Sequence, residues 1–114
     1  MIVQEIVSAL ALQVAAGADR LDYEVTGGYA SDLLSCVMAG ARKGNIWVTL
    51  QAHPNVVAVA QLLNLAAVII TEGMQPTAET VAKANEHHLP LLLASEDTYR
   101  VVGHLVTLGV QGNA

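Results

Sequence analysis

Short apolar runs alternate with helical patterns throughout the second half of the chain. Three runs rich in Val, Ile and Leu predict buried strands, at residues 46–50, 67–71 and 91–94. Helical patterns follow these runs at residues 55–65, 76–88 and 95–108. Successive strand–helix units with short connections form parallel sheets through right-handed crossovers. The sequence therefore predicts an α/β fold with a mostly parallel sheet flanked by helices.

The first half of the chain is less regular. It predicts a helix over 2–10, a short strand over 12–15, a β-leaning segment over 24–29 and a helix over 31–41. Ser31 and Asp32 are expected to cap that last helix, and Thr77 is expected to cap the helix over 76–88. A length of 114 residues suits one domain, 1–114, with a frayed tail from about residue 109.

The composition indicates a protein that is covered by a partner. The chain is 54% hydrophobic and only 13% charged, and its mean hydropathy of +0.48 is high for a small soluble monomer. We therefore expect a homodimer or a larger protein partner. The net charge of −5, with five scattered basic residues, argues against nucleic-acid binding. No apolar tract is long enough to cross a membrane, and the start of the chain does not resemble a secretory signal, so we expect a soluble, cytoplasmic protein.

Polar residues follow each of the predicted parallel strands. Because ligands bind beyond the carboxyl ends of such strands, these residues form a candidate ligand rim. The rim comprises Gln51, His53, Asn55, Thr71, Glu72 and Ser95. Helix N-termini behind the rim would favour a nucleotide or another anionic metabolite. The same residue types also cap helices and bind loop backbone, and this alternative is the more common one.

Nothing in the sequence indicates catalysis. His53 and Glu72 could form a general base and its orienting partner, but no activated serine or cysteine has a motif around it. A phosphate-binding glycine motif is also missing. The single Cys36 excludes an internal disulfide and a multi-thiolate zinc site, and it is expected to be a buried apolar residue. His87 and His88 are adjacent, so their rings point to different sides of a helix and are poorly placed to share a metal. We expect no enzyme activity, cofactor or metal.

A resemblance to the DRTGG domain family extends over nearly the whole chain. The segment LDYEVTGGY at residues 21–29 resembles the stretch that names the family, and the resemblance continues through residues 31–35, 47–55, 57–60, 67–73 and 89–92. Asp22, Thr26, Gly27 and Gly28 match the residues that name the family. Tyr23 stands in place of the arginine, and Cys36 stands where an acidic residue is expected.

The resemblance implies an accessory domain. Similar domains occur within CBS-domain pyrophosphatases, in the amino-terminal region of some phosphotransacetylases and as separate proteins, and the fold is similar to the amino-terminal domain of HPr kinase. The implied function is a non-catalytic regulatory or protein-interaction module, and the alternative is a sensor of an anionic metabolite. The matching residues Asp22, Thr26, Gly27 and Gly28 are candidates for a ligand site or an interface. The glycine pair itself predicts positive φ in a tight turn, or a close approach of another segment.

Overall fold

The computed structural model describes residues 1–113, which form a five-stranded sheet with the order β1-β5-β4-β3-β2. The strands are β1 (Gln13–Ala16), β2 (Gly27–Ala30), β3 (Asn45–Thr49), β4 (Ala67–Ile70) and β5 (Leu91–Leu93). Strands β2 to β5 are parallel, and β1 pairs antiparallel with β5. The predicted α/β fold with a mostly parallel sheet is confirmed.

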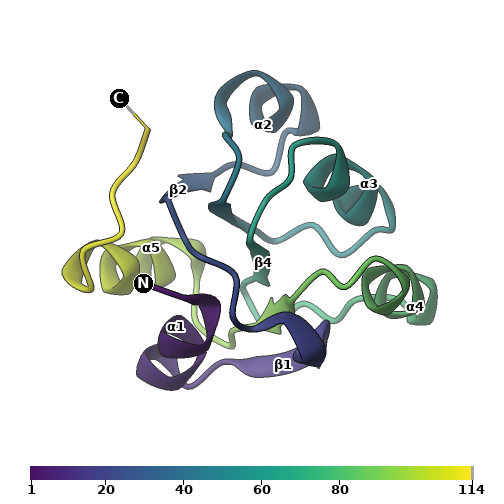
Figure 1. Ribbon diagram of the computed structural model, residues 1–114, viewed down its shortest axis with the longest axis horizontal. Helices are drawn as coiled ribbons and strands as arrows, with labels where there is room; N and C mark the ends of the chain where they lie inside the picture. Colours follow the sequence, from purple (N-terminus) through teal and green to yellow (C-terminus); the bar gives the residue numbers. More distant parts are fainter. Residues whose placement is uncertain (114) are drawn as a thin grey trace.

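Helices cover both faces of this sheet (Figure 1). The helices are α1 (Val3–Leu10), η1 (Ala18–Arg20), α2 (Leu34–Gly40), α3 (Asn55–Leu62), α4 (Ala78–Glu86) and α5 (Thr98–Thr107). Helices α2, α3 and α4 pack on one face, and α1 and α5 pack on the other. No helix within residues 1–113 is both long and apolar enough to cross a membrane.

The central strands are buried on both faces, which explains their nearly continuous apolar sequences. Successive side chains of a strand point to opposite faces, so Trp47 and Val68 pack under α2–α4. Their neighbours Ile46 and Ile69 pack under α1 and α5. The buried Trp47 indole N–H donates a hydrogen bond to the backbone carbonyl of Ser31, at 2.9 Å. The strands thus bury two apolar layers without leaving this polar atom unpaired.

Two helix starts illustrate where the local prediction is right and where it is wrong. Thr77 caps α4 as predicted, since its hydroxyl accepts a hydrogen bond from the backbone N–H of Thr80. Helix α2 begins later than predicted, at Leu34, and no side chain caps it. The Asp32 carboxylate, predicted to cap this helix, instead accepts hydrogen bonds from Thr49 and Leu50 at the end of β3. Competition from a distant partner therefore overrides the local capping pattern.

The segment after α5 is ordered up to Asn113, which corrects the predicted frayed tail. Val110 is buried, and the carbonyl of Gln111 accepts a hydrogen bond from the Gly28 N–H at 2.9 Å. The Asn113 side-chain amide donates to the carbonyl of Gly40 at 3.0 Å. This segment lies along β2 and covers the outer edge of that strand, which would otherwise expose unpaired backbone groups.

Candidate functional site

The predicted rim lies at the carboxyl edge of the parallel strands, where each loop leads into a helix. The structure adds Asp32, which follows β2, to this edge. One Asp32 carboxylate oxygen accepts hydrogen bonds from the Thr49 hydroxyl and the Leu50 N–H, both at 2.8 Å. The Gln51 side-chain amide donates to the Asp32 carbonyl at 2.9 Å. Asp32 therefore ties the loop after β3 to the loop after β2.

The two residues considered as a general base and its partner hold the starts of different helices. The His53 ring atom Nδ1 accepts a hydrogen bond from the Asn55 N–H at 3.1 Å, at the start of α3. The Glu72 carboxylate accepts from the Thr98 N–H at 2.8 Å, at the start of α5. Each side chain satisfies an N–H group that a helix start leaves without an intrahelical partner. These contacts match the capping alternative.

Thr71 completes the hydrogen bonding of this edge. Its buried hydroxyl pairs with the Thr98 hydroxyl at 2.7 Å and also reaches the carbonyl of Thr49 at 3.4 Å. Asn55 and Ser95 are exposed at the same edge. Acidic side chains dominate the rim, since Glu96 and Asp97 join Asp32 and Glu72 there. These carboxylates would repel an anionic ligand.

The segment that matches the family signature lies at the opposite, amino edge of the sheet, so the structure separates the candidate residues into two groups. Gly27 and Gly28 begin β2, and neither has positive φ, so the predicted tight turn is wrong. The pair instead allows close approach: a Cβ on Gly27 would lie 2.9 Å from the carbonyl oxygen of Gln111. The Thr26 hydroxyl donates to the carbonyl of Lys43 at 2.8 Å.

Arg20, which lies outside the segment that matches the family signature, is close to Asp22. The Arg20 Nε atom is 3.1 Å from the Asp22 carboxylate, and the Arg20 guanidinium stacks 4.2 Å from the Tyr23 ring centroid. This hydrogen bond holds the pKa of Asp22 below its usual range and raises the pKa of Arg20. Arg20 thus places a positive charge next to Asp22, although Tyr23 replaces the signature arginine.

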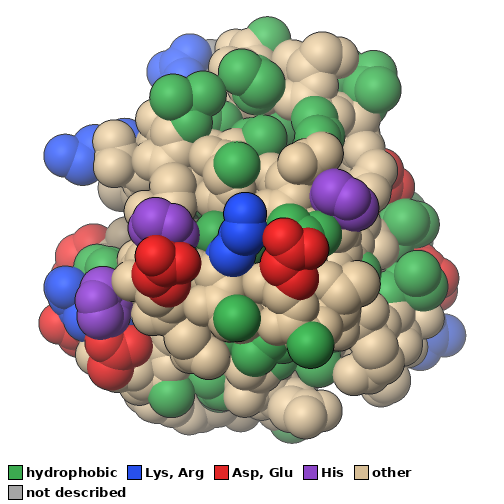
Figure 2. Space-filling view, turned by 90° about the vertical axis from the view of Figure 1, so that its right-hand side faces the viewer, with side chains coloured by type: hydrophobic (Ala, Val, Ile, Leu, Met, Phe, Trp, Pro, Cys, Tyr) green, Lys and Arg blue, Asp and Glu red, His purple; other side chains and the backbone are tan. Residues whose placement is uncertain are grey.

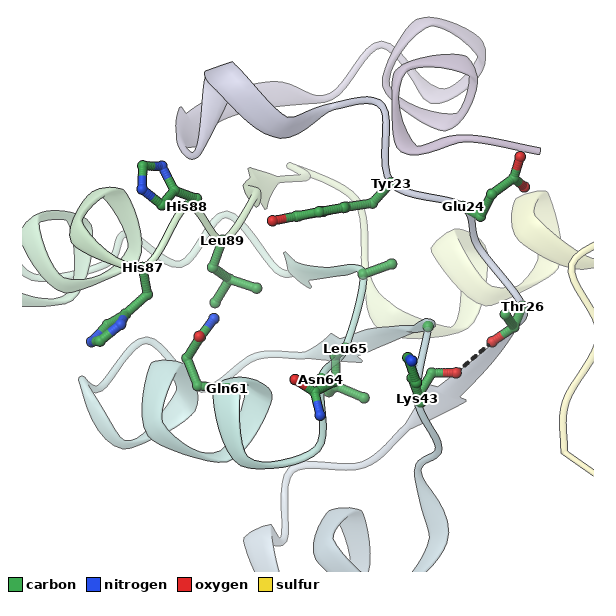
Figure 3. Close-up of a pocket in the computed structure, with 12 residues that line it drawn as sticks. Tyr23, Glu24, Thr26, Lys43, Gln61, Asn64, Leu65, His87, His88 and Leu89 are labelled. Carbon is green, nitrogen blue, oxygen red and sulfur yellow. Dashed lines mark hydrogen bonds between the residues drawn. The ribbon is translucent and has the colours of Figure 1, made fainter.

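A pocket opens at this amino edge of the sheet (Figure 3). Its volume is about 450 Å³. The lining residues are Tyr23, Glu24, Thr26, Lys43, Gly44, Gln61, Asn64, Leu65, Ala66, His87, His88 and Leu89. Of the sequence-predicted site residues, it includes only Thr26. We call this cavity the amino-edge pocket.

Two helix ends build the amino-edge pocket. Asn64 after α3 and His88 after α4 both adopt positive φ, which lets the following N–H bond back five residues into the helix. The Leu65 N–H donates to the carbonyl of Ala60, and the Leu89 N–H donates to the carbonyl of Ala84. Each helix end is thus satisfied by backbone alone, and the leucine that follows it is buried and forms the pocket floor. A polar residue followed by a leucine, which recurs after α3 and after α4, was the available sequence signal for this pocket.

The remaining chemically distinctive residues do not form a further centre. Cys36 is exposed on α2, which corrects the expectation that it is buried. His87 and His88 follow the end of α4 rather than lying within the helix, and their rings point in different directions (Figure 3). The Nδ1 atom of His88 lies 2.6 Å from the Asp19 carboxylate. Within residues 1–113, no cluster of three or more His, Cys, Asp or Glu side chains could hold a metal ion.

Comparison with known proteins identifies the domain. The regulatory region of Clostridium perfringens pyrophosphatase, whose CBS and DRTGG domains were crystallised with the activator diadenosine tetraphosphate, has a similar fold, with a TM-score of 0.73 at 14% sequence identity. The match covers 92% of this chain and 46% of that one, so the present chain spans about half of the solved region. No curated protein matches the sequence. The model of the DRTGG domain matches residues 5–108, and the chain therefore belongs to the DRTGG domain family.

Proposed function

We propose that this chain is a non-catalytic regulatory module that acts through protein contact, as a homodimer or on a larger protein. Membership of the DRTGG family and the similarity to part of a pyrophosphatase regulatory region support a regulatory role. The hydrogen bonds of His53 and Glu72 support the absence of catalysis, because both side chains are occupied at helix starts.

The observation that carries this proposal is the exposure of large apolar side chains on α2 and α3. Leu33 is 60% exposed, Met38 is 49% exposed and Leu62 is 65% exposed. Only Val37 of α2 is buried. Figure 2 shows several hydrophobic side chains over its upper part, where α2 and α3 lie, and a row of charged and histidine side chains across its middle. Apolar side chains gathered in this way commonly mark an interaction surface.

A second copy of the chain is the simplest occupant of this surface. The exposed residues of α2 carry no charge between Leu33 and Gly40, so two such surfaces can meet without burying an unpaired charge. Burial of apolar area would then drive association.

Size-exclusion chromatography with light scattering tests self-association. We expect the mass of two chains at micromolar concentration, and we expect Leu62→Glu to give the mass of one chain with an unchanged circular dichroism spectrum. The matched control is Val106→Glu, at an equally exposed valine on α5, which should remain dimeric. The mass of a single chain at every concentration would contradict the homodimer.

A second candidate function, a sensor of a nucleotide or another anionic metabolite, is favoured by one finding. The similar pyrophosphatase region was crystallised with the activator diadenosine tetraphosphate. The carboxylates of the rim disfavour an anion there, so a ligand of this kind would need a different site on this chain.

A further inference from the structure

We propose that the amino-edge pocket binds a small molecule that combines a planar ring with a single anionic group. The proposal deepens the sensor function and rests on it for its regulatory meaning. It does not depend on self-association through α2 and α3.

The pocket has the size and floor of a small-molecule site. Its volume of about 450 Å³ falls within the usual range for such sites, about 300–1,000 Å³. Leu65, Ala66 and Leu89 are almost fully buried and form an apolar floor. Their positions are fixed by the two helix ends and by the start of β4, so the floor exists before any ligand binds.

Tyr23 supplies an aromatic surface above this floor. Figure 3 shows its ring extending over the pocket, with the hydroxyl end directed over Leu89. The Arg20 guanidinium stacks on the ring and helps to hold it in place. Aromatic and aliphatic surfaces on opposite sides of a cavity favour a flat ligand, because a ring can contact both at once. The first part of the ligand is therefore a planar ring.

Polar side chains around the pocket are available for a ligand. Within residues 1–113, the side chains of Gln61, Asn64 and Lys43 form no hydrogen bond or ion pair, and neither does the ring of His87. The amides of Gln61 and Asn64 can both donate and accept hydrogen bonds, which suits the edge of a heteroaromatic ring.

Among the charged side chains that line the pocket, the Lys43 ammonium has no ion-pair partner within residues 1–113. The Glu24 carboxylate lies 3.3 Å from the amino-terminal ammonium of Met1, and the Asp19 carboxylate is bound to His88. Lys43 has no such partner among the described residues, although the whole chain has a net charge of −5. An anionic group on the ligand can therefore pair with the Lys43 ammonium, and we assign one such group.

Isothermal titration calorimetry with four probes tests this assignment on the complete chain. Adenosine monophosphate and indole-3-acetate each combine a ring with an anion, adenosine has the ring without the anion, and inorganic phosphate has the anion without the ring. We expect binding of at least one of the first two probes. We also expect both adenosine and phosphate to bind at least about tenfold more weakly.

Three pocket variants locate the binding, and one variant serves as the charge-matched control. We expect a roughly tenfold loss of affinity for the probe that binds the wild type in each of three variants, Lys43→Gln, Gln61→Ala and Tyr23→Leu. Their melting temperatures should stay close to that of the wild type. Arg100→Gln removes the same charge from an exposed side chain on α5, at the other edge, and should leave binding unchanged.

The remaining outcomes separate this inference from the sensor function. Binding that survives all three pocket variants would overturn the pocket assignment but leave the sensor function standing. Equal binding of adenosine and adenosine monophosphate would overturn the role of Lys43. If none of the four probes binds at millimolar concentration, both the pocket assignment and a sensor of this ligand class are wrong.

Discussion

The rim and the amino-edge pocket contain similar residue types, but their side chains have different partners. At the rim, Asp32, His53 and Glu72 each accept a hydrogen bond from a backbone N–H of the chain itself. At the amino-edge pocket, the side chains of Lys43 and Gln61 have no partner among residues 1–113. Polar residues at the edge of a sheet are therefore a poor guide to a ligand site until their partners are known.

The difference follows from the direction of the helices. Helices begin at the carboxyl edge, where their first N–H groups need acceptors, and side chains such as Glu72 provide them. Helices α3 and α4 end at the amino edge, where the left-handed residues Asn64 and His88 let the backbone close on itself. Side chains near these ends are not needed for capping and remain available to a ligand.

The largest loss of stability is expected for a substitution at the rim. Asp32→Ala removes the acceptor of two hydrogen bonds, one of which satisfies the buried Thr49 hydroxyl. We expect the free energy of unfolding, measured in urea, to fall by about 2 to 4 kcal/mol. Asp32→Asn keeps an acceptor oxygen and should cost less than half as much.

The matched variant in the amino-edge pocket should leave stability almost unchanged. Lys43→Gln removes an exposed charge that has no partner among residues 1–113, so we expect the free energy of unfolding to change by no more than about 0.5 kcal/mol. A loss as large as that of Asp32→Ala would break the comparison, since the pocket would then also be structural.

At the family signature we expect a loss of stability that is smaller than that of Asp32→Ala. A Cβ on Gly27 would press against the Gln111 carbonyl, so Gly27→Ala should lower stability by about 1 to 2 kcal/mol as the final segment shifts. Gly112→Ala is the control, because a Cβ there meets no atom within 4 Å. Thermal unfolding of both variants measures the difference. Unchanged stability of Gly27→Ala would refute the packing role of this glycine.

Only a slight effect on stability is expected from the ion pair of Arg20 and Asp22. Because Arg20 holds the pKa of Asp22 below its usual range, the pair stabilises the fold above the ordinary aspartate pKa. This contribution is lost as the pH falls through the lowered pKa of the folded state. Solvent screens both exposed groups, so the effect on stability should be slight.

A carboxyl NMR titration measures this effect directly. We expect the Asp22 midpoint to lie below that of an ordinary aspartate and to rise in Arg20→Gln. An unchanged midpoint in that variant would show that Arg20 does not hold the Asp22 charge.

Much of the fold was predictable because its signals are local. The apolar runs that form β3, β4 and β5 differ from helical patterns within five residues of sequence, and short connections then require parallel pairing. Thr77 was predictable as a cap because its partner is only three residues away. The candidate site was less predictable, since Thr26 is the only candidate site residue from the sequence analysis that lines the amino-edge pocket.

The sequence by itself determined the order of strands and helices, the two-sided burial of the sheet and the family of the domain. The tertiary structure alone decided that Asp32 joins two loops and that Gly28 receives the final segment as a neighbour. These partners are 18 and 83 residues apart in the chain, so no local pattern contains them. The tertiary structure also places the ends of α3 and α4 beside Tyr23 around one cavity, because packing across the sheet brings these distant segments together.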